Sequence, residues 1–297
     1  MTKRFLPQRY KTSFAMKKLL PISKMLLLTL QAVFLISCHQ PARGQVSVPY
    51  QLNRPEVIEL KKGVDNISGI AYSTAGHVVY AIDDDHGDVY KIPLQQDPQI
   101  EKWHFGAPED FEDIVLVNNN IYVLSSKGRI AYMPLRFPVT SVQYSGLAAK
   151  GKNNFETLFK DPASNRLLMV CKECSADSKK KTSVFAFDLD KKEMLPEPVA
   201  TLHLKEVNAL LSGDPIKELR PSAAAVQPQT GEIYMLASVN KLLLILDRQL
   251  RIKAVYRLDP KIFKQPEGIT FSPAGDLLIS NEAGKKGKAD ILIFRKK

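Results

Sequence analysis

The stretch Asn66-Ile-Ser-Gly-Ile-Ala-Tyr72, followed by a polar turn and by His77-Val-Val-Tyr-Ala-Ile82, decides the fold, because its pattern returns four times along the chain. In every copy two apolar runs flank a short segment rich in Asn, Asp, Pro or Gly, as in two antiparallel strands joined by a turn. The later copies begin at Asp110, Asn154, Arg220 and Gln265. Self-similarity of this kind indicates a repeat architecture, in which each unit packs on the next.

The equivalent apolar position of each copy recurs at a nearly fixed interval. These positions are Ile70, Ile114, Leu158, Ala224 and Ile269. Successive members are 44, 44, 66 and 45 residues apart. A period in the low forties with several short strands is the signature of a β-propeller blade.

Further runs of alternating apolar residues complete each unit. Third strands are predicted at residues 88–94, 128–135, 183–189, 242–246 and 290–294. Fourth strands are predicted at residues 100–105, 140–144, 199–204 and 253–258. The last copy ends after its third strand, and residues 57–60 have the pattern of the missing fourth. We therefore predict an all-β, five-bladed β-propeller with four-stranded antiparallel blades, closed by an N-terminal strand that removes exposed sheet edges.

The 66-residue interval departs from the period. Residues 205–212 within it favour an insertion with one short helix, and a degenerate sixth blade is the alternative. Five blades account better for the strand count.

The first 37 residues follow an export pattern, in which a basic stretch precedes an apolar run. The run Met25–Ile36 spans 12 residues, whereas a membrane-spanning helix needs about 20. It ends in Leu35-Ile36-Ser37-Cys38, which resembles a bacterial lipobox and implies acylation of Cys38, with stable anchoring by several acyl chains. An ordinary secretory signal is the alternative. We predict a lipoprotein signal peptide at 1–37, a lipidated linker at 38–54 and the propeller at 55–297, on a cell-envelope membrane (outer membrane or periplasm-facing).

The net charge of +11 belongs largely to this leader. Residues 1–37 hold seven basic and no acidic side chains, which leaves 35 basic and 31 acidic residues in the remainder. A mildly basic surface of this kind does not indicate nucleic-acid binding.

Cys171 and Cys174 are the cysteines that remain after Cys38. Their C-x-x-C spacing lacks the βαβ context of a thioredoxin-like site, and no further ligand pair completes a zinc site. A local disulfide in an oxidising compartment, or two thiols, is the favoured interpretation.

Propeller geometry predicts which polar residues meet. The first two strands of a blade are antiparallel, so the start of the first and the end of the second emerge on one face, near the channel mouth. This places together Ser68, Glu112, Glu156, Ser222, Glu267, Asp83, Asp84, Asp85, Ser125, Lys172, Ser238, Asn281 and Glu282.

Converging carboxylates repel one another unless a counter-charge is present. Calcium takes six to eight oxygen ligands in flexible geometry, which suits loops from several blades. The predicted ligands are Glu112, Glu156, Glu267, Asp83, Asp84, Asn281 and Glu282. The alternative is that the glutamates only bind backbone N–H groups of neighbouring blades. The Asp83–Asp88 segment lacks the alternating acids and closing glutamate of an EF-hand.

The units Asn66-Ile-Ser-Gly-Ile, Phe111-Glu-Asp-Ile, Phe155-Glu-Thr-Leu and Gln265-Pro-Glu-Gly-Ile, in this order, resemble the SdiA-regulated (YjiK-type) family, a group that includes calcium-regulated propeller proteins of bacterial envelopes. The resemblance covers residues 55–297 and implies a five-bladed propeller, distantly similar to NHL-repeat proteins, with a calcium site. It brings no settled activity.

Carried over by position, the resemblance implies metal-site roles for Glu112, Glu156 and Glu267, and for the pair Asn281 and Glu282. The chain departs from the family pattern at three positions, Asp113, Thr157 and Lys172. The first two replace a glycine or small residue. Lys172 stands where an acid is expected, and it can neutralise one carboxylate.

Two functions are compatible with these features. The favoured one is a non-catalytic, calcium-binding envelope scaffold that presents the mouth to a protein or small-molecule partner. The alternative is a calcium-dependent hydrolase, of phosphoesterase or lactonase type, with Glu112, Glu282 or His86 as the general base. Arg129 and Lys172 are the only cations that the sequence places nearby, which is few for a phosphate-rich substrate. No catalytic residue is assigned.

Overall fold

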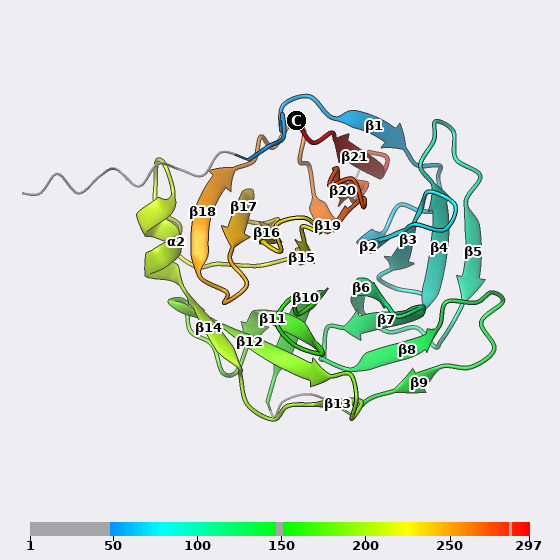
Figure 1. Cartoon of the computed structure of the whole chain (residues 1–297), viewed down its shortest axis with the longest axis horizontal. Coiled ribbons are helices and arrows are strands. Elements are labelled where there is room, and N and C mark those ends of the chain that lie inside the picture. Colours follow the sequence, from blue (N-terminus) through cyan, green and yellow to red (C-terminus); the bar gives the residue numbers. More distant parts are fainter. Residues whose placement is uncertain (1–47, 147–150, 285–286) are drawn as a thin grey trace, which may run out of the picture. The chain divides into compact units, whose positions relative to one another are not determined.

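Five antiparallel β-sheets surround a common centre in the computed structural model, one sheet per blade (Figure 1). The structure describes residues 48–146, 151–284 and 287–297, which belong to the unit Gln45–Lys297. The predicted signal peptide, Cys38 and most of the linker lie outside the described residues. The five-bladed propeller is confirmed.

Each blade uses consecutive strands, as the repeat predicts. The first contains β2 (Ile67–Ser73), β3 (Val78–Asp83), β4 (Asp88–Pro93) and β5 (Glu101–His104). The second contains β6 (Phe111–Val117), β7 (Asn120–Ser125), β8 (Ile130–Pro134) and β9 (Gln143–Tyr144). The third contains β10 (Asn153–Lys160), β11 (Arg166–Cys174), β12 (Lys181–Asp188), β13 (Glu193–Met194) and β14 (Ala200–His203). The fourth contains β15 (Ala223–Val226), β16 (Ile233–Ala237), β17 (Leu242–Leu246) and β18 (Ile252–Arg257).

The fifth blade joins the two ends of the propeller, in the strand order β1 (Glu56–Glu59), β21 (Asp290–Phe294), β20 (Leu277–Asn281) and β19 (Pro266–Phe271). Val57 opposes Leu292 and Ile58 opposes Ile291 in an antiparallel register. The predicted closure by an N-terminal strand is therefore confirmed, with β1 one residue earlier than expected.

Substitution of Ile58 tests this closure. Ile58 is 1% exposed and packs in the core between the fifth and first blades, whereas its neighbour Val57 is 39% exposed. We expect Ile58→Ala to lower the free energy of unfolding by about 2–4 kcal/mol, the usual cost of truncating a buried isoleucine. Val57→Ala is the matched control and should change it by less than about 0.5 kcal/mol. Urea unfolding measures both. Equal effects of the two substitutions would contradict the closure.

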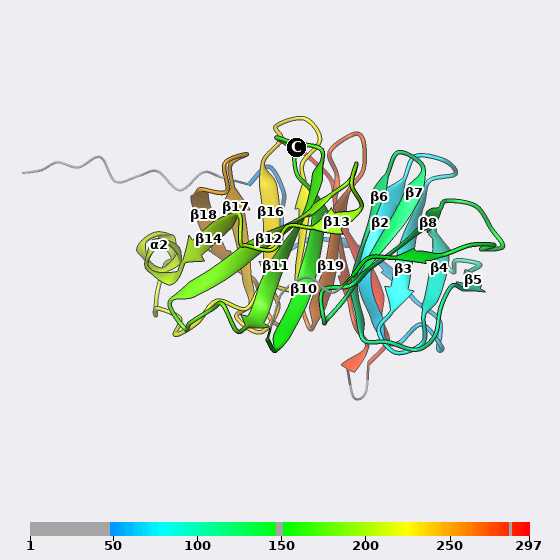
Figure 2. The same ribbon diagram turned by 90° about the horizontal axis from the view of Figure 1, so that it is seen from below.

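The innermost strands β2, β6, β10, β15 and β19 contact one another in cyclic order, including β19 with β2. Apolar side chains from adjacent blades fill the space between sheets, for example Ile82 of β3 with Phe111 of β6. Figure 2 shows the strands running between two faces of this unit. We call the face at which the innermost strands begin the mouth face.

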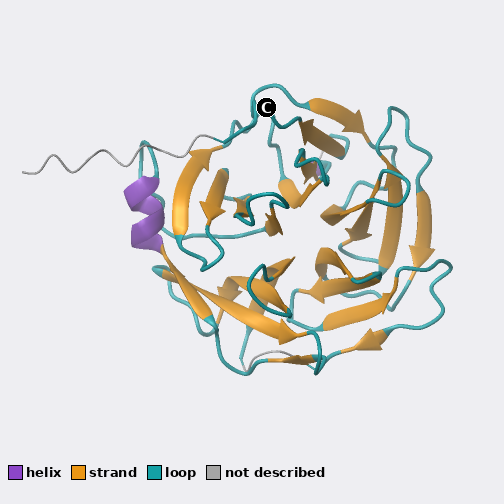
Figure 3. Cartoon of the chain, in the orientation of Figure 1, coloured by secondary structure: helices purple, strands orange, loops and turns teal. Residues whose placement is uncertain are grey.

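The 66-residue interval holds an insertion and no sixth blade. In the third blade the outer position is divided between β13 and β14, which pair with opposite ends of β12. The helix α2 (Leu204–Leu210) follows and contacts β14 and β18 on the outer side of the ring (Figure 3). Within the described residues, no helix has the length and apolar character needed to cross a membrane.

The fourth strand of the second blade is shorter than predicted, since only Gln143 and Tyr144 pair with β8. The segment before it contains Phe137, which packs outside the ladder and stacks on Trp103 with ring centroids 4.0 Å apart. Phe137, Val139 and Val142 pack against the core between the first and second blades without pairing with β8, so the predicted start of this strand at residue 140 is wrong.

Candidate metal centre at the channel mouth

Three glutamates of the mouth occupy equivalent β-bulges. Glu112 lies between two paired positions of β6, Phe111 and Asp113, and has no cross-strand partner on β7. Glu156 and Glu267 hold the same place in β10 and β19. A bulge turns a side chain away from the regular alternation of the strand. The repeat thus presents one bulged glutamate from each of three blades.

Close approach of the innermost strands explains the glycine that follows the bulge. A Cβ atom on Gly69 would lie 2.6 Å from Asp113 Cα, and one on Gly268 would lie 2.8 Å from Ile70 N. No side chain fits at either position without displacing backbone. The glycines of the two Gly-containing repeats are therefore required by packing between blades.

Asp113 replaces this glycine in the second blade and has a structural role. Its side chain is buried; Oδ1 accepts a hydrogen bond from Ile114 N at 2.8 Å, and Oδ2 accepts one from Leu158 N at 2.7 Å. Burial holds the pKa of Asp113 well above its usual value, although the two N–H donors oppose that rise. Asp113 joins β6 to β10 and is not a ligand of the mouth.

The bulge glutamates lie in a strongly acidic environment. Burial raises the pKa of Glu112 to about 9, and the charges of Glu156 and Asp110 add to the effect. Burial likewise raises the pKa of Glu267 to about 7, again with a contribution from Glu156. Burial also raises the pKa of Glu156, against the opposing charge of Lys172. Burial is the first cause of all three shifts, and the charge of Glu156 adds to those of Glu112 and Glu267.

Lys172 is the cation in direct contact with this group. It forms an ion pair with Glu156, whose Oε1 also accepts a hydrogen bond from Asn154 Nδ2 at 3.2 Å. Burial acts to lower the pKa of Lys172, but the charges of Glu156, Glu267 and Glu112 leave it raised. The neutralisation expected from the sequence is present, and it satisfies one carboxylate.

Asp84 and Glu282 form a second group of acids beside the bulge glutamates. Burial, followed by the charges of Asp85 and Asp83, raises the pKa of Asp84 to about 6, and Glu282 and Asp110 contribute. Burial raises the pKa of Glu282 as well, although a hydrogen bond from Gln265 opposes it. Asp84 and Glu282 therefore belong to the acidic mouth.

Asp83 is already engaged by its own surroundings, whereas Asn281 is held through its amide nitrogen and keeps its oxygen without a hydrogen-bond donor from the residues that the structure describes. Asp83 Oδ1 accepts hydrogen bonds from Asp85 N at 2.9 Å and His86 N at 3.1 Å, and contacts His86 Nδ1 at 2.8 Å. Its Oδ2 accepts one from Tyr90 at 3.1 Å. Asn281 is fully buried and donates through Nδ2 to Ile262 O at 3.0 Å. Both residues organise the loops around the mouth.

Some buried oxygens remain unpaired. Among the described residues, Asp84 Oδ1, Asn154 Oδ1 and Asn281 Oδ1 are buried and accept no hydrogen bond within the protein. Buried acceptors without a donor are costly, and a cation or water satisfies them. Asp84 and Asn154 border the acidic group, so the donor chemistry suits a hard cation.

The carboxylate oxygens of the mouth are farther apart than the ligand atoms of a preformed metal site made by protein residues alone. In the described part of the chain, the group of three His, Cys, Asp or Glu ligand atoms lying within 4.8 Å of one another is Cys171, Cys174 and Asp177. Those two cysteines are joined by a disulfide, with Cα atoms 5.7 Å apart. A cation at the mouth would therefore be held by acids from different blades together with amide oxygens and water, which calcium accepts.

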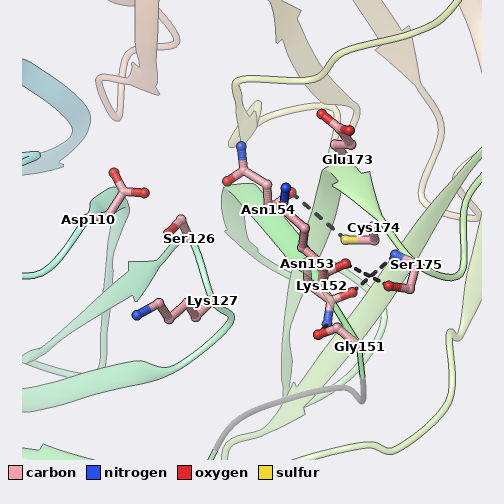
Figure 4. A pocket seen from close by; sticks show the side chains of 10 residues that line it. All are labelled: Asp110, Ser126, Lys127, Gly151, Lys152, Asn153, Asn154, Glu173, Cys174 and Ser175. Carbon is pink, nitrogen blue, oxygen red and sulfur yellow. Dashed lines mark hydrogen bonds between the residues drawn. The ribbon is translucent and has the colours of Figure 1, made fainter.

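A cavity of about 730 Å³ opens beside the mouth, between the second and third blades (Figure 4). Asp110 and Asn154 line it on the side of the acidic group, and Lys127 and Lys152 also line it. The sequence placed only Arg129 and Lys172 nearby. Arg129 instead pairs with Glu109, and the cavity has two lysines that sequence reasoning missed.

The repeat carries a signal for two residues of the mouth that the ligand prediction omitted, Asp110 and Asn154. In every repeat a polar residue lies two positions before the bulge glutamate or before the serine that replaces it. These residues are Asn66, Asp110, Asn154, Arg220 and Gln265. In the structure three of these side chains donate hydrogen bonds to mouth acids: Asn66 to Asp85 Oδ2 at 3.0 Å, Asn154 to Glu156 Oε1 at 3.2 Å, and Gln265 to Glu282. Alignment of the five units at this position would have identified Asp110 and Asn154.

Comparisons with known proteins agree with the repeat. A family model described as SdiA-regulated matches residues 50–284. No curated protein matches the chain.

Among solved structures, the glutaminyl cyclase of Myxococcus xanthus is 14% identical, with a TM-score of 0.54 over 81% of this chain and 94% of that one. A glucose dehydrogenase is 11% identical, with a TM-score of 0.52 over 80% and 99%. A luciferin-regenerating enzyme is 10% identical, with a TM-score of 0.51 over 80% and 95%. Likeness at this identity shows the fold alone.

Proposed function

The chain belongs to the SdiA-regulated family, and from this premise and the acidity of its channel mouth we propose that it is a calcium-binding protein of the cell envelope. In this proposal the propeller is a non-catalytic scaffold. Its mouth face, ordered by the bound cation, is presented to a protein or small-molecule partner.

The observation that carries the proposal is the convergence of three bulge glutamates from three blades, of which Glu156 is buried and Glu112 and Glu267 are partly buried. Glu112 and Glu267 have pKa values raised to about 9 and about 7, while the one ion pair with Lys172 is made by Glu156. Ionisation of these carboxyl groups in the folded protein is unfavourable without a counter-ion, which is what their raised pKa values express. A bound divalent cation provides this counter-charge.

The donor set suits calcium better than softer or smaller metals. Carboxylate and amide oxygens are the ligands of hard cations, and calcium tolerates irregular geometry with several waters, whereas magnesium demands an octahedron. Glu112, Glu156, Glu267 and Asp84 would hold the ion with Asn154. When bound, it would neutralise the carboxylates and fix segments of the four blades that supply these residues. The protein residues supply only oxygen ligands.

Thermal unfolding with added calcium tests the proposal. We expect calcium to raise the unfolding temperature of the wild type in a concentration-dependent way, because a ligand of the folded state stabilises it by mass action. Glu267→Gln should lose most of this response. Glu197→Gln, which removes an exposed acid between β13 and β14, is the control and should keep it. A wild type that does not respond to calcium would refute calcium binding.

Attachment to a membrane is the second part of the proposal, and the lipobox-like sequence ending at Cys38 supports it. We expect Cys38→Ala to move the protein from the membrane fraction to the soluble envelope fraction, because the acylated thiol is lost. Ser37→Ala keeps a small residue before the cysteine and should remain with membranes. Membrane retention of the Cys38 variant would contradict the anchor.

A calcium-dependent hydrolase is the second candidate, favoured by the cavity beside the mouth. Lys127 and Lys152 line it together with Asp110, so an anionic substrate would find two cations close to the proposed metal. Phosphoester and lactone panels, with calcium and with a chelator, test this activity. Calcium-dependent turnover that Lys152→Gln reduces would establish the hydrolase over the scaffold.

A further inference from the structure

Lys172 and Glu156 occupy two adjacent bulges of the third blade. On β11 the register passes from Glu173, opposite Asn154, directly to Cys171, opposite Phe155, so Lys172 has no cross-strand partner. One position later Glu156 is skipped on β10. The side chains of these two bulged residues, Lys172 and Glu156, form an ion pair with each other. The double bulge thus directs a lysine at the acidic group.

A disulfide brackets the bulged lysine. Cys171 lies directly before Lys172 and Cys174 two residues after it, and the two sulfurs are bonded. Cys171 is fully buried in the core between the second and third blades. The backbone that carries Lys172 is therefore closed into a four-residue loop and attached to the core.

Global stabilisation does not account well for this bond. A disulfide stabilises mainly by restricting the unfolded chain, and the effect is smallest for the shortest loops. The residues enclosed by this one are Lys172 and Glu173. Its main physical consequence is local: it fixes the position from which Lys172 reaches Glu156.

We propose, resting on the calcium site above, that Lys172 is a built-in competitor of the metal ion and that the Cys171–Cys174 disulfide holds it in that role. The ammonium of Lys172 already neutralises Glu156 through Oε1, so this carboxylate attracts calcium less while the ion pair persists. The oxidised protein therefore binds calcium more weakly than the reduced one. The disulfide therefore couples the redox state of the compartment to the binding of calcium at the mouth.

The coupling reaction is a thiol–disulfide exchange. A dithiol reductant transfers two electrons and two protons, the Cys171–Cys174 bond breaks to two thiols, and the reductant becomes a disulfide. Access is through Cys174, which lines both the 730 Å³ cavity and a neighbouring one of about 420 Å³ bounded by Lys172 and Arg220. The bulge then loses its covalent closure, and Lys172 is no longer held at Glu156.

Calcium titration calorimetry on four proteins tests the proposal: wild type, Lys172→Gln, Cys171→Ser/Cys174→Ser, and the triple variant. Lys172→Gln should tighten calcium binding about tenfold or more, since a charged hydrogen bond no longer competes. The double cysteine variant should tighten it to a lesser extent. The cysteine changes should have no effect in the Lys172→Gln background, because both act through one contact. Lys179→Gln, an exposed lysine of the next loop, controls for net charge.

A calcium-free measurement provides an independent readout. Without calcium, Lys172→Gln should unfold at a lower temperature than the wild type, because Glu156 loses its partner; saturating calcium should remove or reverse that difference. If the cysteine variant does not fold, wild type reduced with dithiothreitol replaces it. Calcium binding unchanged by Lys172→Gln, or changed equally by Lys179→Gln, overturns the competitor. Calcium binding by none of the proteins overturns the metal site itself.

Discussion

Asp113→Ala is expected to lower the free energy of unfolding by about 2–4 kcal/mol, because it leaves two buried N–H groups without an acceptor. The acceptors lost are Oδ1, bonded to Ile114 N, and Oδ2, bonded to Leu158 N of the next blade. The cost is partly offset, since burying the carboxylate is itself unfavourable, as its raised pKa shows. Urea unfolding at constant pH measures the difference.

Two comparisons make this prediction specific. Asp190→Ala removes an exposed carboxylate that accepts a hydrogen bond from Asn165, and it should cost less than about 0.5 kcal/mol. Asp113→Gly restores the residue that the first and fifth blades have at this position, and it should be as damaging as alanine, because Leu158 N still loses its acceptor. An Asp113→Ala protein with the urea midpoint of the wild type would contradict the proposed contact between blades.

The calcium-free protein is expected to be more stable at about pH 5.5 than at about pH 8.5, by a few kcal/mol. Folding raises the pKa of Glu267 from 4.5 to about 7 and that of Glu112 to about 9. An acid with a raised pKa binds its proton more tightly in the folded state. Its stabilising contribution is complete below the unfolded pKa and is lost as the pH rises through the folded one.

Burial is the largest cause of the raised pKa of Glu112, and the surrounding charges modify it. Glu156, Asp110 and Glu267 raise its pKa, and Lys172 opposes them. Calcium should reverse the pH trend, because it binds the ionised carboxylates. Urea unfolding across this pH window, with a chelator and with calcium, measures both effects, and Glu112→Gln/Glu267→Gln should flatten them. Calcium-free stability that rises from about pH 5.5 to about pH 8.5 would contradict the assignment.

The repeat made most of the fold predictable from the sequence. Strand pairs recur with the same turn, so the five copies specify the blades and the alternation of apolar residues specifies their register. The N-terminal strand followed from the count, because the last copy lacked a fourth strand. The short β9 did not follow, because an apolar pattern does not distinguish residues that pair with β8 from Val139 and Val142, which pack on the core without pairing.

The sequence predicted which face of the propeller carries the candidate site, but not the role of each residue there. Antiparallel strands place Glu112, Glu156 and Glu267 together, and the structure shows each at a bulge. The sequence could not separate ligands from loop-organising residues. Asp83 ends β3 and Asp84 follows it, but Asp83 Oδ1 accepts hydrogen bonds from its own loop, and that depends on turn geometry.

The closure of Lys172 by a disulfide was beyond sequence reasoning for a different reason. Cys171 and Cys174 were compatible with a bond or with two thiols, and nothing in their spacing predicts a bulge. The pairing of Lys172 with Glu156 could be anticipated because the two are at equivalent ends of neighbouring strands. The covalent closure that holds the lysine there became visible only from the pairing register of β10 and β11 and from the disulfide.

A crystal structure grown with calcium tests the central claim most directly. We expect an anomalous peak at the channel mouth, with oxygens of Glu112, Glu156 and Glu267 at about 2.3–2.6 Å and Lys172 moved off Glu156. A mouth that holds only water at saturating calcium, with the Lys172–Glu156 pair intact, would contradict it.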